Sequence, residues 1–203
     1  MNIGTPSEPT VKSIRSYLKE FLSDPDVIDT NPIIRWVIVN LFVAPFRPRT
    51  ILSQYQSIWT NNGSPLLVNS NKFAKEIANK NPNIIFELGM RYGEPSIELG
   101  LIKLKKAGVS KIILLPMFPQ YAKATSGSCI NKAIEIIHKL NLNLKYEIIE
   151  YFYNKKFFID NIVKSISESQ AYHESDFLLF SFHGLPQRQI KKLDLSNKHC
   201  LIK

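Results

Sequence analysis

Residues 111–140 read KIILLPMFPQYAKATSGSCINKAIEIIHKL and contain the pattern that decides the fold class. The apolar run from Lys111 to Leu115 is short enough for a buried strand, and a proline follows it directly. From Ser128 to Leu140 the apolar side chains recur at helical spacing. The stretch therefore predicts one strand, a loop at its carboxyl end, and a helix that returns along the sheet.

The same alternation continues on both sides of this stretch. Further strands are expected at residues 84–88, 146–151 and 177–182, and further helices near 96–106 and 157–169. The amino-terminal part is expected to be helical at 11–22, 33–44, 50–59 and 70–80, with Pro45, Pro48 and two arginines separating the middle two segments. Strands that alternate with helices predict an α/β protein of the doubly wound class, with a parallel sheet covered on both faces.

The composition excludes several classes of protein. With 44% hydrophobic residues, the 203-residue chain has enough apolar material for a packed core. Its two cysteines show no C-x-x-C spacing, which favours a reducing compartment and a cytoplasmic location over a disulfide or zinc framework. The longest apolar run, Ile33 to Phe46, contains Arg35 and Asn40 and is too short to cross a bilayer.

The formal net charge of +9 is spread along the chain. Because no basic stripe with interleaved aromatic residues stands out, a solvated basic surface is the favoured interpretation, and no nucleic-acid partner is expected. A basic surface also suits an acidic small molecule or an anionic membrane face.

Two of the loops that follow predicted strands carry candidate binding residues, since ligands of open α/β sheets bind at the carboxyl ends of strands. After 84–88 comes Arg91, a fixed cation that can hold a carboxylate, or that pairs with a local acid such as Glu94. After 111–115 come Met117, two aromatic rings and the hydroxyl-rich residues 125–128. The rings would line a flat apolar pocket, and the hydroxyls would cap the next helix or bind an anion.

His183 follows the strand expected at residues 177–182, and Gly184 and Pro186 fix the backbone around it. An imidazole at such a position suits metal ligation or proton transfer near neutral pH, although a lone histidine is more often structural. The three other histidines, at 138, 173 and 199, are assigned to the surface. Cys129 is interpreted as a packing residue of its helix.

Six motifs, in this order, together resemble the ferrochelatase family, whose members insert ferrous iron into protoporphyrin IX. The resemblance runs over almost the whole chain, and six ordered motifs are far more specific than any one of them. They are Asn2-Ile3-Gly4-Thr5-Pro6, Phe21-Leu22-Ser23-Asp24-Pro25, Gly63-Ser64-Pro65-Leu66, Arg91-Tyr92-Gly93, Pro119-Gln120-Tyr121 with Gly127-Ser128, and Ser181-Phe182-His183-Gly184-Leu185-Pro186.

The resemblance implies two doubly wound, Rossmann-like domains with a porphyrin cleft between them. It implies no organic cofactor, with Fe²⁺ as a substrate. His183 would be the catalytic residue, binding the iron or accepting pyrrole protons. The positions that would contact the porphyrin are Ser64, Arg91, Tyr121, Tyr55, Arg47 and Arg49.

The run from Ile33 to Phe46 would correspond to a lip over the cleft that touches membrane peripherally, and a buried helix is the open alternative. The resemblance also implies a first domain at residues 1–118 that lacks its opening strand. Residues 119–203 would be the first half of a truncated second domain. The catalytic glutamate opposite the histidine would lie beyond this chain, so a non-catalytic, porphyrin-binding remnant stays open as the alternative function.

Overall fold

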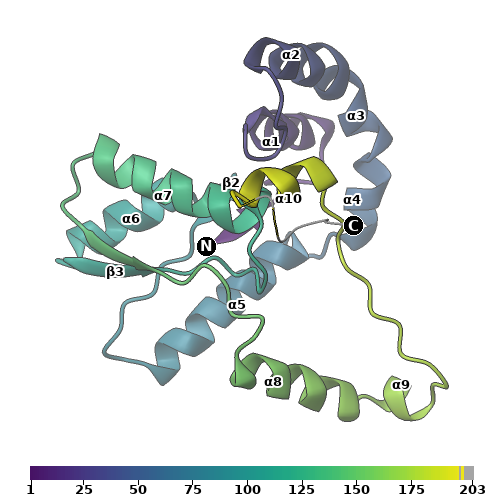
Figure 1. Ribbon diagram of the computed structural model, residues 1–203, viewed down its shortest axis with the longest axis vertical. Helices are drawn as coiled ribbons and strands as arrows, with labels where there is room; N and C mark the ends of the chain where they lie inside the picture. Colours follow the sequence, from purple (N-terminus) through teal and green to yellow (C-terminus); the bar gives the residue numbers. More distant parts are fainter. Residues whose placement is uncertain (197, 199–203) are drawn as a thin grey trace. The chain divides into compact units, whose positions relative to one another are not determined.

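The computed structural model describes residues 1–196 and 198, and it divides the chain into two compact units, Met1–Tyr151 and Phe152–Lys203 (Figure 1). The division falls after residue 151, because strands on either side of residue 118 pair with each other. The division into domains at residue 118 stays a prediction.

The first unit contains four short parallel strands. β1 (Asn2–Gly4) pairs with β2 (Met90–Tyr92), and β3 (Lys111–Leu114) pairs with β4 (Lys145–Ile148). The parallel arrangement confirms the expected α/β class. Backbone bonds of Met1 link the two pairs: its ammonium donates to the Leu115 carbonyl at 2.7 Å, and its carbonyl accepts from the Met117 N–H at 2.8 Å.

Two glycines allow β1 and β2 to approach each other closely at their carboxyl ends. Gly4 has a φ of +102°, and a β-carbon built there would meet the Tyr92 carbonyl oxygen at 1.8 Å. Gly93 has a φ of +79°, and its β-carbon would lie 2.8 Å from the Thr5 carbonyl oxygen. Both positions therefore require glycine, because any side chain would collide with the facing backbone.

Helices α6 and α7 cover β3 and β4. The helices of the first unit are α1 (Val11–Ser23), α2 (Pro32–Val37), the π-helix η1 (Ile38–Val43), α3 (Ala44–Thr50), α4 (Leu52–Ile58), α5 (Pro65–Lys80), α6 (Ile97–Lys106), the π-helix η2 (Lys123–Gly127) and α7 (Ser128–Lys139). Ile97, Leu101, Ile112, Cys129 and Ile136 belong to the shared core of these elements. Cys129 is thus a packing residue, as its helical position predicts.

The prolines do not interrupt the helical run of α2, η1 and α3, although the sequence predicts a break there. Pro45 lies at the start of α3, directly after the π-helix η1. Pro48 lies inside α3 and leaves the Ala44 carbonyl without its usual partner, but Arg15 Nε donates to that oxygen at 2.9 Å. A side chain of α1 therefore supplies the donor that Pro48 lacks.

Two predicted strands are wrong. Residues 84–88 form no strand, and the strand in that region is β2, a few residues later. The second unit consists of α8 (Lys156–Ser167), α9 (Gln170–His173) and α10 (Gln187–Leu193), and its described residues include no strand. Residues 177–182 are extended but exposed, with Phe177 92% and Leu179 91% accessible. A strand needs a neighbour to pair with, and this segment has none among the described residues.

Residues 2–4 form a strand at the opening of the first unit, and the expectation that the first domain lacks its opening strand stays a prediction. No helix in the described part of the chain is both long enough and apolar enough to span a membrane.

Candidate functional site

The carboxyl ends of β1 and β2 meet the start of α5. Thr5 follows β1, and its hydroxyl donates to Ser64 Oγ at 2.9 Å. Both side chains are buried, Ser64 being 5% exposed at the amino-terminal end of α5. The predicted site residue Ser64 is therefore in this loop cluster, but its hydroxyl is already bonded to a neighbouring loop.

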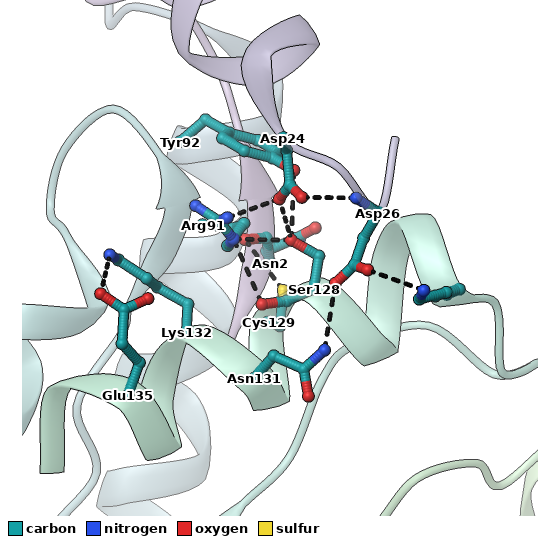
Figure 2. Close-up of polar contacts among 11 residues, drawn as sticks. Asn2, Asp24, Asp26, Arg91, Tyr92, Ser128, Cys129, Asn131, Lys132 and Glu135 are labelled. Carbon is teal, nitrogen blue, oxygen red and sulfur yellow. Dashed lines mark hydrogen bonds and ion pairs between the residues drawn. The ribbon is translucent and has the colours of Figure 1, made fainter. Parts of the chain in front are cut away.

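Arg91 lies within β2, and its partner is Asp24, the residue that follows α1 (Figure 2). Arg91 Nη2 is 2.5 Å from Asp24 Oδ2, and Arg91 Nε donates to Ser128 Oγ at 2.6 Å. The pairing with Glu94 that the sequence left open is wrong, since Glu94 accepts instead from the Ser96 N–H at 2.7 Å.

One carboxylate oxygen of Asp24 is the centre of this cluster (Figure 2). Besides Arg91, Oδ2 accepts from Ser128 Oγ at 2.5 Å and from Tyr92 Oη at 2.8 Å. Oδ1 accepts from the Asp26 N–H at 2.7 Å. The cluster ties α1, β2 and α7 together in the first unit.

Burial by itself would raise the pKa of the Asp24 carboxyl. The hydrogen bonds to its two oxygens and the charge of Arg91 outweigh this effect, so that the pKa lies below its ordinary value. Burial raises the pKa of Tyr92, so its hydroxyl stays protonated and remains a donor. At neutral pH the cluster therefore contains an ionised Asp24 surrounded by donors.

Tyr121 lies in the loop between β3 and α7, and 38% of its surface is exposed. Its hydroxyl lies against Gly127, where a β-carbon would come within 2.8 Å of Tyr121 Oη. The hydroxyl-rich segment neither caps α7 nor offers free N–H groups, since the Gly127 N–H donates to the Ala122 carbonyl and Ser128 Oγ bonds to Asp24. This segment instead positions one exposed aromatic ring.

The arginine pair lies on α3. Arg47 and Arg49 are exposed, and neither makes an ion pair within residues 1–196 and 198. Arg49 lines an open hollow of about 500 Å³ together with Arg15, Lys19 and Phe46.

Tyr55 lies on α4 and is half-buried against the small core formed by Ile14, Leu18 and Ile51. Burial raises its pKa.

His183 belongs to the second unit, whereas the six predicted porphyrin-binding residues belong to the first. It is exposed, and its Nδ1 lies 2.8 Å from the Gly184 carbonyl oxygen. It does not follow a buried strand, contrary to the sequence prediction. Across the described part of the chain, no three His, Cys, Asp or Glu side chains form a group suited to holding a metal ion. His138 and His173 are exposed as expected, and His199 lies outside the described residues.

Sequence reasoning missed four residues of the first unit that hold the predicted ones in place. They are Thr5, Asp24, Tyr92 and Ser128. All four lie in the motifs at 2–6, 21–25, 91–93 and 127–128. Their presence in the same motifs as the predicted site residues is the one sequence feature that could have pointed to them. A buried acid after a helix needs a counter-charge, but the sequence does not show that Arg91, 67 positions away, supplies it.

Comparison with known proteins supports the identification. The ferrochelatase family model matches residues 1–201. A protein of Coxiella burnetii (strain CbuK_Q154) named ferrochelatase is 42% identical over 193 residues, which cover 95% of this chain and 53% of that protein. A ferrochelatase of Actinobacillus pleuropneumoniae serotype 7 is 39% identical over 204 residues, or 98% of this chain and 62% of that protein.

A ferrochelatase of Hamiltonella defensa is also 39% identical, and the match covers 98% of this chain and 63% of that protein. The chain thus spans between about half and two thirds of the length of these relatives. Because the family model matches almost every residue and the relatives are about 40% identical, the chain belongs to the ferrochelatase family.

Proposed function

We propose that this chain takes part in the insertion of Fe²⁺ into protoporphyrin IX to form haem, the last step of haem biosynthesis. The family membership supports this reaction. Protoporphyrin is a large apolar disc with two carboxylates at one edge, so its site needs apolar walls and a few cations.

The observation that carries the proposal is the surface of the helical run from α2 to α3. Trp36, Phe42 and Phe46 are 59%, 63% and 67% exposed on this run. Arg47 and Arg49 lie next to them in sequence, without an ion-pair partner among the described residues. Unpaired guanidinium groups beside apolar rings match the chemistry of a propionate-bearing disc.

Tyr121 and Arg91 have separate roles in the proposal. The exposed ring of Tyr121 contacts the face of the porphyrin. Arg91 uses Nε and Nη2 for Ser128 and Asp24, and no bond of its Nη1 is described within residues 1–196 and 198. That nitrogen is left to donate to a propionate, with the guanidinium orientation fixed by Asp24.

His183 binds the incoming iron or accepts pyrrole protons. Its Nδ1 faces a carbonyl oxygen, which can only accept, so Nδ1 carries the proton and Nε2 carries the free lone pair. An imidazole held in this tautomer presents a nitrogen ready for a metal ion or a proton. Fe²⁺ is a substrate in this proposal, and no resident cofactor is required.

The exposed apolar side chains of α2 and η1 also support peripheral contact with a membrane on the cytoplasmic side. Ile33, Ile34 and Leu41 are 74%, 52% and 54% exposed, which is not the pattern of a buried helix. Sedimentation with phosphatidylglycerol vesicles tests this: Phe42→Asp is expected to release the chain, whereas Phe73→Asp on α5 serves as a control and is expected to leave it bound.

The proposal is tested by comparing protoporphyrin IX with its dimethyl ester in fluorescence titrations. The free acid is expected to bind at least about tenfold more tightly, because the ester cannot pair with arginine. The Arg47→Gln/Arg49→Gln variant should reduce that preference, with Arg91 keeping part of it, and Lys80→Gln, an exposed change on α5, should leave it whole. Equal affinity for acid and ester in the wild-type chain would contradict the proposed site.

A further inference from the structure

The hydrogen bond between Thr5 and the predicted porphyrin-binding residue Ser64 has a direction that leaves Ser64 its own hydrogen. Thr5 Oγ1 donates to Ser64 Oγ at 2.9 Å, so Ser64 is the acceptor. A serine hydroxyl has one hydrogen to donate and two lone pairs that accept. Across residues 1–196 and 198, Ser64 Oγ has no further hydrogen-bond partner, so its hydrogen is left unused.

The unused hydrogen belongs to a buried hydroxyl. Ser64 is 5% exposed and Thr5 is 8% exposed. A buried donor without an acceptor has lost the hydrogen bond that water would supply to it. The Ser64 hydroxyl therefore gains from an acceptor that arrives with a ligand, and a carboxylate is among the strongest acceptors.

Ser64 does not use its hydroxyl for the helix that it begins. It is the N-cap of α5, where a serine oxygen ordinarily accepts from an N–H of the first turn. The Ser64 side chain makes no such bond. Its oxygen is instead bonded to Thr5 in the loop after β1, so Thr5 decides the orientation of the hydroxyl.

Thr5 is itself restricted in conformation. It directly follows β1 and precedes Pro6, which disfavours a helical backbone at Thr5. Its β-branched side chain has few allowed χ1 rotamers. β1 and α5 are also joined by a second bond, in which Asn2 Nδ2 donates to Ser70 Oγ at 3.3 Å. Loss of the Thr5 hydroxyl would therefore leave the strand attached to the helix.

We propose that Thr5 is a positioning residue for porphyrin binding, because its bond to Ser64 Oγ orients the Ser64 hydroxyl to donate its hydrogen to a porphyrin propionate. The inference rests on the proposed function, since it requires a propionate beside Ser64. Thr5 acts through Ser64 and makes no contact with the porphyrin. Its donor also strengthens the Ser64 bond to the propionate, because hydrogen bonds in a chain polarise one another.

Fluorescence titrations of the whole chain with protoporphyrin IX and with its dimethyl ester measure the effect. Thr5→Val keeps the shape of the side chain and removes its donor. The affinity for the free acid should fall about fivefold, and the affinity for the ester less than about twofold, because hydrogen bonds to an ionised acceptor are stronger. Thr5→Ser keeps the hydroxyl and should keep the wild-type affinities.

Ser70→Ala is the matched control, because it removes the other side-chain bond between β1 and α5 and leaves Ser64 untouched. It should leave both affinities unchanged. In the Ser64→Ala background, Thr5→Val should weaken binding no further, since its effect passes through Ser64. Thr5→Ala removes the same donor with a smaller side chain and provides the same test should the valine variant fail to fold.

The titrations separate this inference from the proposed function. A wild-type preference for the free acid that persists undiminished in Thr5→Val would overturn the inference alone. Equal losses for acid and ester in Thr5→Val would also overturn it, because they would indicate a purely structural role. A wild-type chain that binds acid and ester equally would overturn the inference and the proposed site together.

Discussion

Arg91 and Asp24 are joined by a 2.5 Å ion pair between two side chains that lie 67 positions apart in the sequence. Asp24 follows α1, and Arg91 lies on β2, so this pair fixes a helix end to the sheet. The side chain of Asp24 is 3% exposed and that of Arg91 is 15% exposed. The pair therefore holds the predicted porphyrin-binding arginine in one orientation.

Asp24→Asn is expected to lower the free energy of unfolding by about 3 kcal/mol, because a buried guanidinium would lose its counter-charge. Urea unfolding followed by circular dichroism measures the change. Asp26→Asn is the matched control, since Asp26 pairs with the half-exposed Lys123 at 3.2 Å and should contribute less than about 1 kcal/mol. Equal losses of unfolding free energy in the two variants would show that the buried Asp24–Arg91 pair stabilises the chain no more than the Asp26–Lys123 pair does.

The same carboxyl predicts a pH dependence. The pKa of Asp24 is lower in the folded chain than its ordinary value of 3.8, so the folded state binds the proton less tightly than the unfolded state. Its stabilising contribution is therefore complete above pH 3.8 and is lost as the pH falls through the folded pKa. The difference in unfolding free energy between wild type and Asp24→Asn should shrink on acidification. A difference that grows toward low pH would reverse the assigned sign.

Gly127→Ala is expected to displace the Tyr121 ring. The backbone of Gly127 is helical, so alanine brings no backbone strain, but its β-carbon would lie 2.8 Å from Tyr121 Oη. Protoporphyrin affinity should fall about fivefold, a loss of about 1 kcal/mol. In the Gly127→Ala/Tyr121→Phe double variant the hydroxyl is gone and affinity should largely return. Additive losses in fluorescence titrations would rule out this contact as the cause.

Arg15 and Pro48 are expected to be energetically coupled. Arg15→Met removes the donor to the Ala44 carbonyl and should destabilise the chain by about 1–2 kcal/mol. In the background of Pro48→Ala, residue 48 regains an N–H that can bond to that carbonyl, so Arg15→Met should cost little there. A double-mutant cycle in urea measures the coupling energy, and a value near zero would mean that the Arg15 bond does not compensate for the proline.

The sequence predicted elements whose pattern is local. The helices at α1 and α7 and the strand at β3 have apolar side chains at the right spacing, and each forms close to where it was expected. The segments at 84–88 and 177–182 have the same apolar character, but a strand also needs a partner, and that depends on distant residues. The helix through Pro48 was missed for the same reason, since the compensating donor is Arg15, 29 positions before the Ala44 carbonyl that accepts its bond.

The candidate site shows the same limit. The motifs selected Ser64, Arg91 and Tyr121, and the structure gives each a defined environment in the first unit. Their partners come from other motifs, because hydrogen bonds such as that between Thr5 and Ser64 form only after the chain folds. The proposed role of His183 rests on the family motif, because His183 and the residues next to it in the second unit are exposed and form no pocket around the imidazole among the described residues.

The proposed function requires that His183 of this chain bind the iron or accept the pyrrole protons. The direct measurement is the anaerobic rate of haem formation from Fe²⁺ and protoporphyrin IX, read by the Soret band, for wild type, His183→Ala and the control His173→Ala. We expect haem formation by the wild type, a loss of at least about 100-fold in His183→Ala with unchanged porphyrin affinity, and no loss in the control. Porphyrin binding without haem formation by the wild-type chain would contradict it, and so would an undiminished rate in His183→Ala.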